Sequence, residues 1–295
     1  MKESKQKLIV ILGPTASGKT ALAEYLASVF DGELINADSR QIYRDMNIGT
    51  AKTPDIHLID IKNPNQSFSV AQYKKLAINI INDIIKRKKI PILAGGTGLY
   101  IKAVIKNLNI PLVPAQKNLR RDLEKQSTEE LFNQLQKCDP KGALHIDRHN
   151  KRRLIRALEV TLASNSAFSV QAKKQSPLFE YIQIGMDVKK EDLLLRIRKR
   201  TSDMIENGLE KEVCTLVGKY GWTNILLTTI GYKEWQRFFE GKITREDVYE
   251  KIIGNSKKYV KKQYTWFNAD KTIKWIKGKD EAVGLVKKFC TDSKN

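Results

Sequence analysis

The chain has 295 residues, 41% of them hydrophobic, and it carries 53 lysines and arginines against 33 aspartates and glutamates, a formal net charge of +20. No apolar run reaches the roughly 18 to 20 residues of a membrane span, and the first residues, MKESKQK, are too polar for a secretory signal, so we expect a cytoplasmic protein. Three widely spaced cysteines exclude a disulfide framework and a CxxC-type zinc or redox site.

The first part of the chain alternates strand-like and helical segments. The strand-like runs are LIVIL (8–12), ELINA (33–37), IHLIDI (56–61) and IPILAG (90–95). The helical pattern between them is clearest in KTALAEYLASVF, where Leu22, Leu26 and Phe30 form one apolar stripe. Such alternation predicts an α/β fold with a parallel sheet and helices on both faces.

From about residue 113 to 180 the sequence is charged, helical and poor in strand signal. We therefore expect a helical insertion domain, 113–180, within a catalytic core formed by 1–112 and 181–295. Strand signal returns in YIQIGMDV (181–188), and KTIKWIK is a candidate edge strand near the C-terminus.

The octet GPTASGKT, residues 13–20, fits the P-loop pattern G-x-x-x-x-G-K-[ST] between a strand and a helix. Its glycines let successive backbone N–H groups point at one anion, and the next helix directs its positive end the same way. Lys19 adds a charge at the terminal phosphate, and Thr20 offers a hydroxyl to Mg²⁺. The expected phosphate-binding residues, which the family resemblance described below assigns to a diphosphate, are Gly13, Pro14, Thr15, Ala16, Ser17, Gly18, Lys19 and Thr20. The alternative is a strand-to-helix turn that needs glycine for its own geometry.

Other motifs are missing or ordinary. There is no base-reading N-K-x-D, and PILAGGTG ends its strand in glycines where many ATPases carry an acidic residue, which disfavours a G protein and a motor ATPase. No His, Cys and Asp spacing indicates a transition-metal site. Trp235 and Trp266 are interpreted as core residues and His57 as structural.

Two further polar positions follow predicted strands. Asp38 and Ser39 come directly after the second strand, at the carboxyl edge where open parallel sheets bind ligands. Asp38 could take a proton from a nucleophile, or it could cap a following helix. Thr97, in GGTGLY, could bind a phosphate or orient a substrate, or it could belong to a tight turn and helix cap.

The positive charge favours a polyanionic partner such as nucleic acid, although biased nucleotide composition can also produce a lysine-rich chain. HNKRRLIRALEV places Arg152 and Arg156 on one helical face with Arg153 adjacent. NSKKYVKKQYTWF interleaves lysines with Tyr259 and other aromatic residues, a pattern suited to RNA. For both segments a solvated amphipathic helix is the alternative.

An ordered set of motifs resembles the tRNA dimethylallyltransferase (IPP transferase) family: GPTASGKT, ADSRQIYRDMNIGTAK, HLID, GGTGLY, RRLIRALEV, GLEKEV, IGYKEW and KKQYTWF. The resemblance runs from about residue 8 to 268. It implies a P-loop NTPase-like core and the transfer of a dimethylallyl group from dimethylallyl diphosphate to the exocyclic amine of the adenine 3′-adjacent to the anticodon, in tRNAs that read codons starting with U.

The resemblance also implies roles for individual residues. Asp38 would be the general base, Thr97 would assist, and Lys19 and Arg200 would act at the diphosphate, with Mg²⁺ as cofactor and Thr20 as its protein ligand. The implied tRNA contacts are Asp38, Ser39, Arg40, Gln41, Thr97, Arg120, Arg152, Arg153, Leu154, Ile155 and Arg156. We expect the protein to act as a monomer, without a membrane partner.

The chemistry agrees with these roles. An allylic diphosphate ionises once its leaving group is neutralised, so the main demand is electrostatic, which the octet and Arg200 meet. An aromatic amine is a poor nucleophile, and a carboxylate that accepts its proton could contribute about 10² to 10⁴ in rate. The target adenine would have to leave its stack.

The chain departs from the family pattern where Ser256-Lys257 and Lys261-Lys262 replace Thr-Arg and Lys-Arg, and where Gln116 replaces an acidic residue. Lysine keeps the positive charge but cannot make the bidentate hydrogen bonds of arginine, so these changes affect RNA binding more than the reaction. Three alternatives stay open: a P-loop kinase acting on a small molecule or nucleotide, an adenylate isopentenyltransferase acting on free nucleotide, and a noncatalytic RNA-binding protein.

Overall fold

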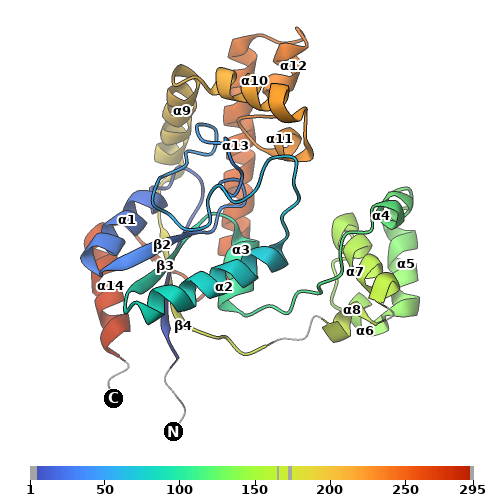
Figure 1. The fold of residues 1–295 in the computed structure, drawn as a ribbon, viewed down its shortest axis with the longest axis horizontal. Helices are drawn as coiled ribbons and strands as arrows, with labels where there is room; N and C mark the ends of the chain where they lie inside the picture. The colour runs from blue at the N-terminus through green and yellow to red at the C-terminus, as the bar shows by residue number, and fades with distance from the viewer. Residues whose placement is uncertain (1–4, 165, 172–174, 293–295) are drawn as a thin grey trace. The chain divides into compact units, whose positions relative to one another are not determined.

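The computed structural model describes residues 5–164, 166–171 and 175–292, which form two compact units. The larger unit comprises Met1–Ile105 and Leu178–Asn295, and the smaller one comprises Lys106–Pro177 (Figure 1). The smaller unit starts and ends a few residues before the expected insertion, 113–180. The shift at its C-terminal end arises because Phe179 is buried in the core of the larger unit.

The larger unit contains a five-stranded parallel sheet in the order β2-β3-β1-β4-β5. The strands are β1 (Lys7–Leu12), β2 (Gly32–Asn36), β3 (Ile90–Gly95), β4 (Glu180–Met186) and β5 (Lys274–Ile276). β1 is central, with Ile9 opposite both Ile92 and Ile182. Its residues are buried on both faces, as expected for a strand covered by helices on two sides. The predicted α/β fold and the late edge strand are confirmed.

Helices cover both faces of this sheet (Figure 1). Those packed on the strands are α1 (Lys19–Val29), α2 (Val70–Lys86), α3 (Gly98–Ile105) and α14 (Lys279–Thr291). The larger unit also contains α9 (Lys190–Glu206), α10 (Leu209–Tyr220), α11 (Asn224–Thr228), α12 (Trp235–Phe239) and α13 (Arg245–Phe267). On one face, Leu22 of α1 and Val286 of α14 pack on Ile9 and Ile11. On the other face, Tyr73 of α2 packs with residues of α3 and β1. In the described part of the chain, no helix has the length and apolar character needed to cross a bilayer.

The expected strand at 56–61 is wrong. This segment touches β2 through a single bridge, between Ile35 and His57, and the backbone then turns away. The turn arises because Leu58 and Asp60 adopt positive φ angles of 65° and 54°, which a strand does not allow. His57 instead pairs with Glu33 at 2.8 Å, in agreement with a structural role.

All the secondary-structure elements described in the smaller unit are helices. Its helices are α4 (Lys117–Glu124), α5 (Thr128–Cys138), α6 (Pro140–Ala143), α7 (Lys151–Ser164) and α8 (Phe168–Gln171). Leu154 and Ile155 of α7 are buried in its core, with 0% and 7% of their surface exposed. The expectation that these two side chains contact tRNA is therefore corrected: they face inward because they fall on the apolar stripe of α7.

Glu159 of α7 is the polar centre of this unit. Its carboxylate is fully buried and accepts hydrogen bonds from Arg120 at 2.7 Å, from Arg156 at 2.6 Å and from the backbone N–H of Gln116 at 2.7 Å. Burial opposes the charge on Glu159, yet the two arginines prevail and lower its pKa. Arg120 and Arg156, both expected at tRNA, thus hold the helices of the unit together.

Replacing Glu159 by alanine should destabilise the smaller unit by about 3 kcal/mol. This is the lower end of the usual cost of breaking a buried ion pair, because both arginines keep contact with water. Hydrogen exchange of the α5 and α7 amides measures this, with the exposed Glu129→Ala as control. The lowered pKa adds a pH dependence: the stabilisation is present above the unfolded value near 4.5 and is lost as the pH falls through the lower folded value. Unchanged exchange in Glu159→Ala would contradict the assignment.

Candidate active site

The octet forms the turn between β1 and α1. Gly18, immediately before α1, has a φ of 88°, a left-handed conformation that favours glycine. The side chain of Ser17 is fully buried, and its Oγ has no hydrogen-bond partner among the described residues. The octet therefore presents the N-terminus of α1, which is suited to an anion.

Lys19 lies where this anion would bind. Its Nζ donates to the Pro14 carbonyl at 3.2 Å. Burial lowers the pKa of Lys19 to about 8, with the nearby Asp38 carboxylate opposing the shift and the Arg200 guanidinium adding to it. A bound phosphate group would stabilise this partly buried ammonium, which has only the Asp38 carboxylate as a nearby negative charge.

Two arginines of α9 also contact the octet. Arg200 Nη1 donates to Thr15 Oγ1 at 3.2 Å, and Arg196 Nη1 donates to the Ser17 carbonyl at 3.3 Å. Burial lowers the pKa of Arg200, while Asp38 opposes the shift. Arg196 was not expected here, although its spacing of four residues from Arg200 on one helix face was a usable signal.

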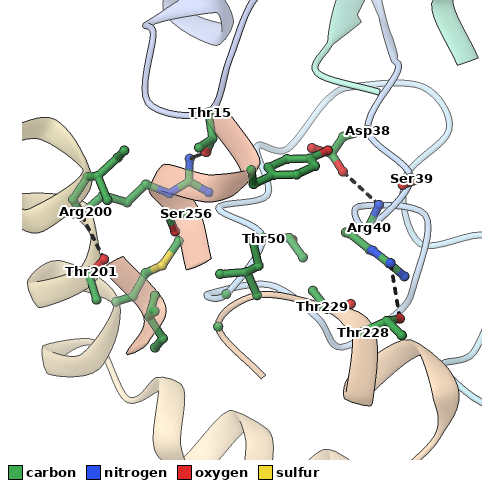
Figure 2. A pocket seen from close by; sticks show the side chains of 17 residues that line it. Thr15, Asp38, Ser39, Arg40, Thr50, Arg200, Thr201, Thr228, Thr229 and Ser256 are labelled. Atoms are coloured by element: carbon green, nitrogen blue, oxygen red, sulfur yellow. Dashed lines mark hydrogen bonds between the residues drawn. The ribbon is translucent and has the colours of Figure 1, made fainter. Parts of the chain in front are cut away.

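Asp38 follows β2 in a turn. Its backbone N–H donates to Asn36 Oδ1 at 2.8 Å, and its Oδ1 accepts from the backbone N–H of Arg40 at 2.8 Å. The alternative that Asp38 caps a helix is wrong, because the next helix is α2, which Ser69 caps. The turn fixes the direction of the carboxylate, which lines a cavity (Figure 2).

Thr97 connects this turn to α13. Its Oγ1 accepts from the backbone N–H of Ser39 at 3.0 Å, and its side chain is hydrogen-bonded to Tyr259. Burial and the Asp38 charge raise the pKa of Tyr259 to about 12, so its phenol stays neutral beside Asp38. In this structure Thr97 orients the segment after Asp38.

Two cavities share four residues of this region: Thr15, Asp38, Thr50 and Arg200. A cavity of about 270 Å³ on the side of the octet is also lined by Lys19 and Thr20. The other cavity, of about 330 Å³, adds the apolar side chains of Ile197, Met204 and Ile252 and polar groups from Arg40, Thr228 and Ser256 (Figure 2). Both linings combine cationic, polar and apolar residues, but Lys19 and Thr20 of the octet line only the first, and Asp38 is common to both.

The remaining expected tRNA residues fall into two groups. In the larger unit, Arg40 Nη2 donates to Thr228 Oγ1 at 3.3 Å, and Gln41 Nε2 donates to the carbonyls of Thr50 and Ala51, both at 3.2 Å. In the smaller unit, Arg152 and Arg153 are exposed. The structure therefore brings the octet, 38–41, Thr97 and Arg200 together around the cavities of the larger unit.

Some residues of the site gave no functional signal in the sequence. Glu212 of α10 accepts from the backbone N–H groups of Asn47 at 3.0 Å, Ile48 at 2.8 Å and Gly49 at 3.2 Å, and from the Tyr232 hydroxyl at 2.7 Å. It fixes the loop that carries Gly49 and Thr50, both of which line a cavity. GLEKEV was noted only as part of the resemblance, because the backbone groups that Glu212 binds, at 47–49, lie more than 160 residues away in the sequence.

Trp266 was expected in the core and is 38% exposed. It lies near the C-terminal end of α13 against Gly98, where a side chain at position 98 would collide with the indole ring. Lys102 Nζ lies 5.8 Å from the centre of this ring. The expectation was wrong because the small residue at 98 lets the ring rest on the surface of α3, whereas Trp235 is fully buried as expected.

Comparisons with known proteins agree with this architecture. Residues 41–270 match the family model described as IPP transferase. A tRNA dimethylallyltransferase of Anoxybacillus flavithermus is 39% identical over 287 residues, covering 94% of this chain and 92% of that protein. The structure of a tRNA isopentenylpyrophosphate transferase from Bacillus halodurans is 35% identical, with a TM-score of 0.72 and coverage of 98% and 96%.

A third similarity is to a eukaryotic dimethylallyltransferase acting on tRNA, at 26% identity and a TM-score of 0.84, covering 97% of this chain and 80% of that one. The match to the family model spans well over half of the sequence, and the similar bacterial proteins align along nearly their whole length. This chain therefore belongs to the IPP transferase family.

Proposed function

We propose that this protein transfers the dimethylallyl group of dimethylallyl diphosphate to the exocyclic amine of the adenine 3′-adjacent to the anticodon, in tRNAs that read codons starting with U. The observation that carries the proposal is the position of Asp38, which lines both a cavity with Lys19 and Thr20 and a cavity with an apolar wall. The first suits a diphosphate, and the second suits a prenyl group and a base. Membership of the IPP transferase family supports this assignment.

The leaving group would be stabilised by the octet, Lys19 and Arg200. As the bond between the allylic carbon and the diphosphate oxygen breaks, negative charge grows on the diphosphate, and buried cations and N–H groups stabilise that charge more in the transition state than in the substrate. Thr15, which receives a hydrogen bond from Arg200, keeps this guanidinium beside the octet.

The donor set at the octet fits Mg²⁺ as the family implies, because the Thr20 hydroxyl and the Asp38 carboxylate line one cavity and Mg²⁺ takes its other ligands from water and substrate phosphate. Thr20 would hold the ion, which when bound would supply further neutralisation of the diphosphate.

Asp38 would accept the proton of the adenine amine while the carbon–nitrogen bond forms. Its direction is fixed by the hydrogen bond from Arg40 N–H and by Thr97, which holds Ser39. The products are then the prenylated adenine, free diphosphate and protonated Asp38. The scheme needs no residue of a second copy, and we propose that the protein acts as a monomer, in the cytoplasm with its tRNA substrate.

The test is incubation with dimethylallyl diphosphate, Mg²⁺ and an unmodified tRNA that reads codons starting with U, followed by mass analysis of the nucleosides. A mass increase on adenosine 3′ of the anticodon is expected. Equal activity on AMP would instead indicate an adenylate isopentenyltransferase, and γ-phosphate transfer from ATP without a prenyl donor would indicate a kinase.

Arg152 and Arg153 are the residues of the smaller unit we propose at the tRNA backbone, because both are exposed and neither is bound to Glu159. The double variant Arg152→Ala/Arg153→Ala should weaken tRNA binding and reduce the slope of log affinity against log salt by about two. Filter binding across salt concentrations measures both quantities. Lys287→Ala/Lys288→Ala, which removes two exposed charges from α14, is the matched control. An unchanged slope in the arginine variant would remove these residues from the RNA contact.

A further inference from the structure

Gln263 connects three elements of the active site. It lies on α13, is 6% exposed, and uses both ends of its side-chain amide. Its Oε1 accepts from the backbone N–H of Thr15 at 3.0 Å, and its Nε2 donates to the carbonyl of Gly96 at 3.0 Å. The first partner belongs to the octet and the second to the turn between β3 and α3.

The backbone at Gly96 leaves room for the side-chain amide of Gln263. A Cβ atom at position 96 would lie 2.5 Å from Gln263 Nε2, so the contact requires glycine there. The residue after Gly96 is Thr97, whose backbone N–H donates to the Ala37 carbonyl at 3.1 Å and whose side chain holds Ser39. Gln263 therefore touches both the octet and the turn that orients the Asp38 segment.

The same face of α13 carries other residues of the site. Tyr259, one helical turn earlier, is hydrogen-bonded to Thr97 and lines the cavity with Ser256. Lys261 and Lys262, beside Gln263 in sequence, are exposed. Gln263, Tyr259 and Ser256 thus place one face of α13 against the site.

We propose that Gln263 is a positioning residue that fixes the octet relative to the Asp38 turn. This inference rests on the proposed function for its meaning in catalysis. The amide is needed because one end must accept and the other must donate. A carboxylate of the same shape can accept from Thr15 N–H, but it can donate to Gly96 only when protonated.

The test uses the full chain with Gln263→Glu and Gln263→Leu. Isothermal titration with inorganic pyrophosphate and Mg²⁺ reports on the octet alone, and single-turnover prenyl transfer reports on catalysis. Both are measured between pH 6 and pH 8.5.

At pH 8 we expect Gln263→Glu to lose about tenfold in pyrophosphate affinity and more in transfer rate. The reason is that the buried carboxylate then faces the Gly96 carbonyl with no proton to donate to it. Both losses should shrink toward pH 6, as the buried carboxylate takes up its proton. Gln263→Leu should show losses that do not change with pH in this way.

A matched control is Gln183 of β4, which is 4% exposed and donates from Nε2 to Asp270 at 3.1 Å and to Thr272 at 2.9 Å. Gln183→Leu should lower the melting temperature without changing pyrophosphate affinity. Wild-type pyrophosphate affinity in folded Gln263→Glu at all pH values, or losses equal to those of Gln183→Leu, would overturn the inference. If the wild-type chain binds pyrophosphate but transfers no prenyl group, the proposed function fails while the pyrophosphate titration still decides the role of Gln263.

Discussion

Replacing Asp38 by asparagine is expected to lower the single-turnover rate of prenyl transfer by about 10² to 10⁴, the usual contribution of a general base. Asparagine keeps an oxygen that can accept from Arg40 N–H, the contact that Asp38 Oδ1 makes at 2.8 Å, so the turn should survive. It cannot take the proton of the adenine amine. Rapid quench with excess protein and labelled dimethylallyl diphosphate measures the chemical step directly.

Affinity for tRNA should stay within a few fold in Asp38→Asn, because the substitution leaves the basic residues unchanged. Asp38→Ala also removes the hydrogen bond from Arg40 N–H. Comparison of the two variants therefore separates the role of Asp38 in proton transfer from its role in holding the loop. A rate near wild type in Asp38→Asn, with a loss only in Asp38→Ala, would assign Asp38 to holding the loop and would remove it from proton transfer.

The fold was predictable where buried strands produce continuous apolar runs. β1 and β3 are such runs, and the burial of most of their residues follows from helices on each side. The segment 56–61 has the same composition but is not a strand, since the positive φ angles of Leu58 and Asp60 cannot be seen in an apolar pattern. Composition therefore predicted which segments are buried better than it predicted their backbone conformation.

The site was predictable where a local motif specifies its own geometry, as the octet does. Roles that depend on distant partners were missed or misassigned. Arg120 and Arg156 look like RNA contacts in sequence, but a carboxylate on α7, Glu159, binds both. Gln263 lies 248 residues from Thr15, and nothing in a helical, basic segment indicates that one of its amides reaches the octet.

Lys19→Met is expected to lower the transfer rate by about 10² to 10³, since it removes a preorganised charge from the place where the leaving group becomes negative. The pKa of Lys19, lowered to about 8 mainly by burial, adds a signature that a purely structural lysine would lack. Below pH 8 the Lys19 ammonium is already charged in the free protein, so diphosphate binding requires no proton uptake at this residue.

Above pH 8 the free protein loses the Lys19 proton, whereas bound diphosphate holds it, because a neighbouring anion raises the pKa of an ammonium group. Affinity for dimethylallyl diphosphate should therefore fall as the pH rises through about 8, and binding there should take up a proton. Calorimetry in buffers of different ionisation enthalpy measures this uptake. Lys19→Arg is the control, as its guanidinium stays charged and the titration of the ligand itself is common to both proteins. Equal proton uptake in wild type and Lys19→Arg would show that another group titrates and would contradict the lowered pKa of Lys19.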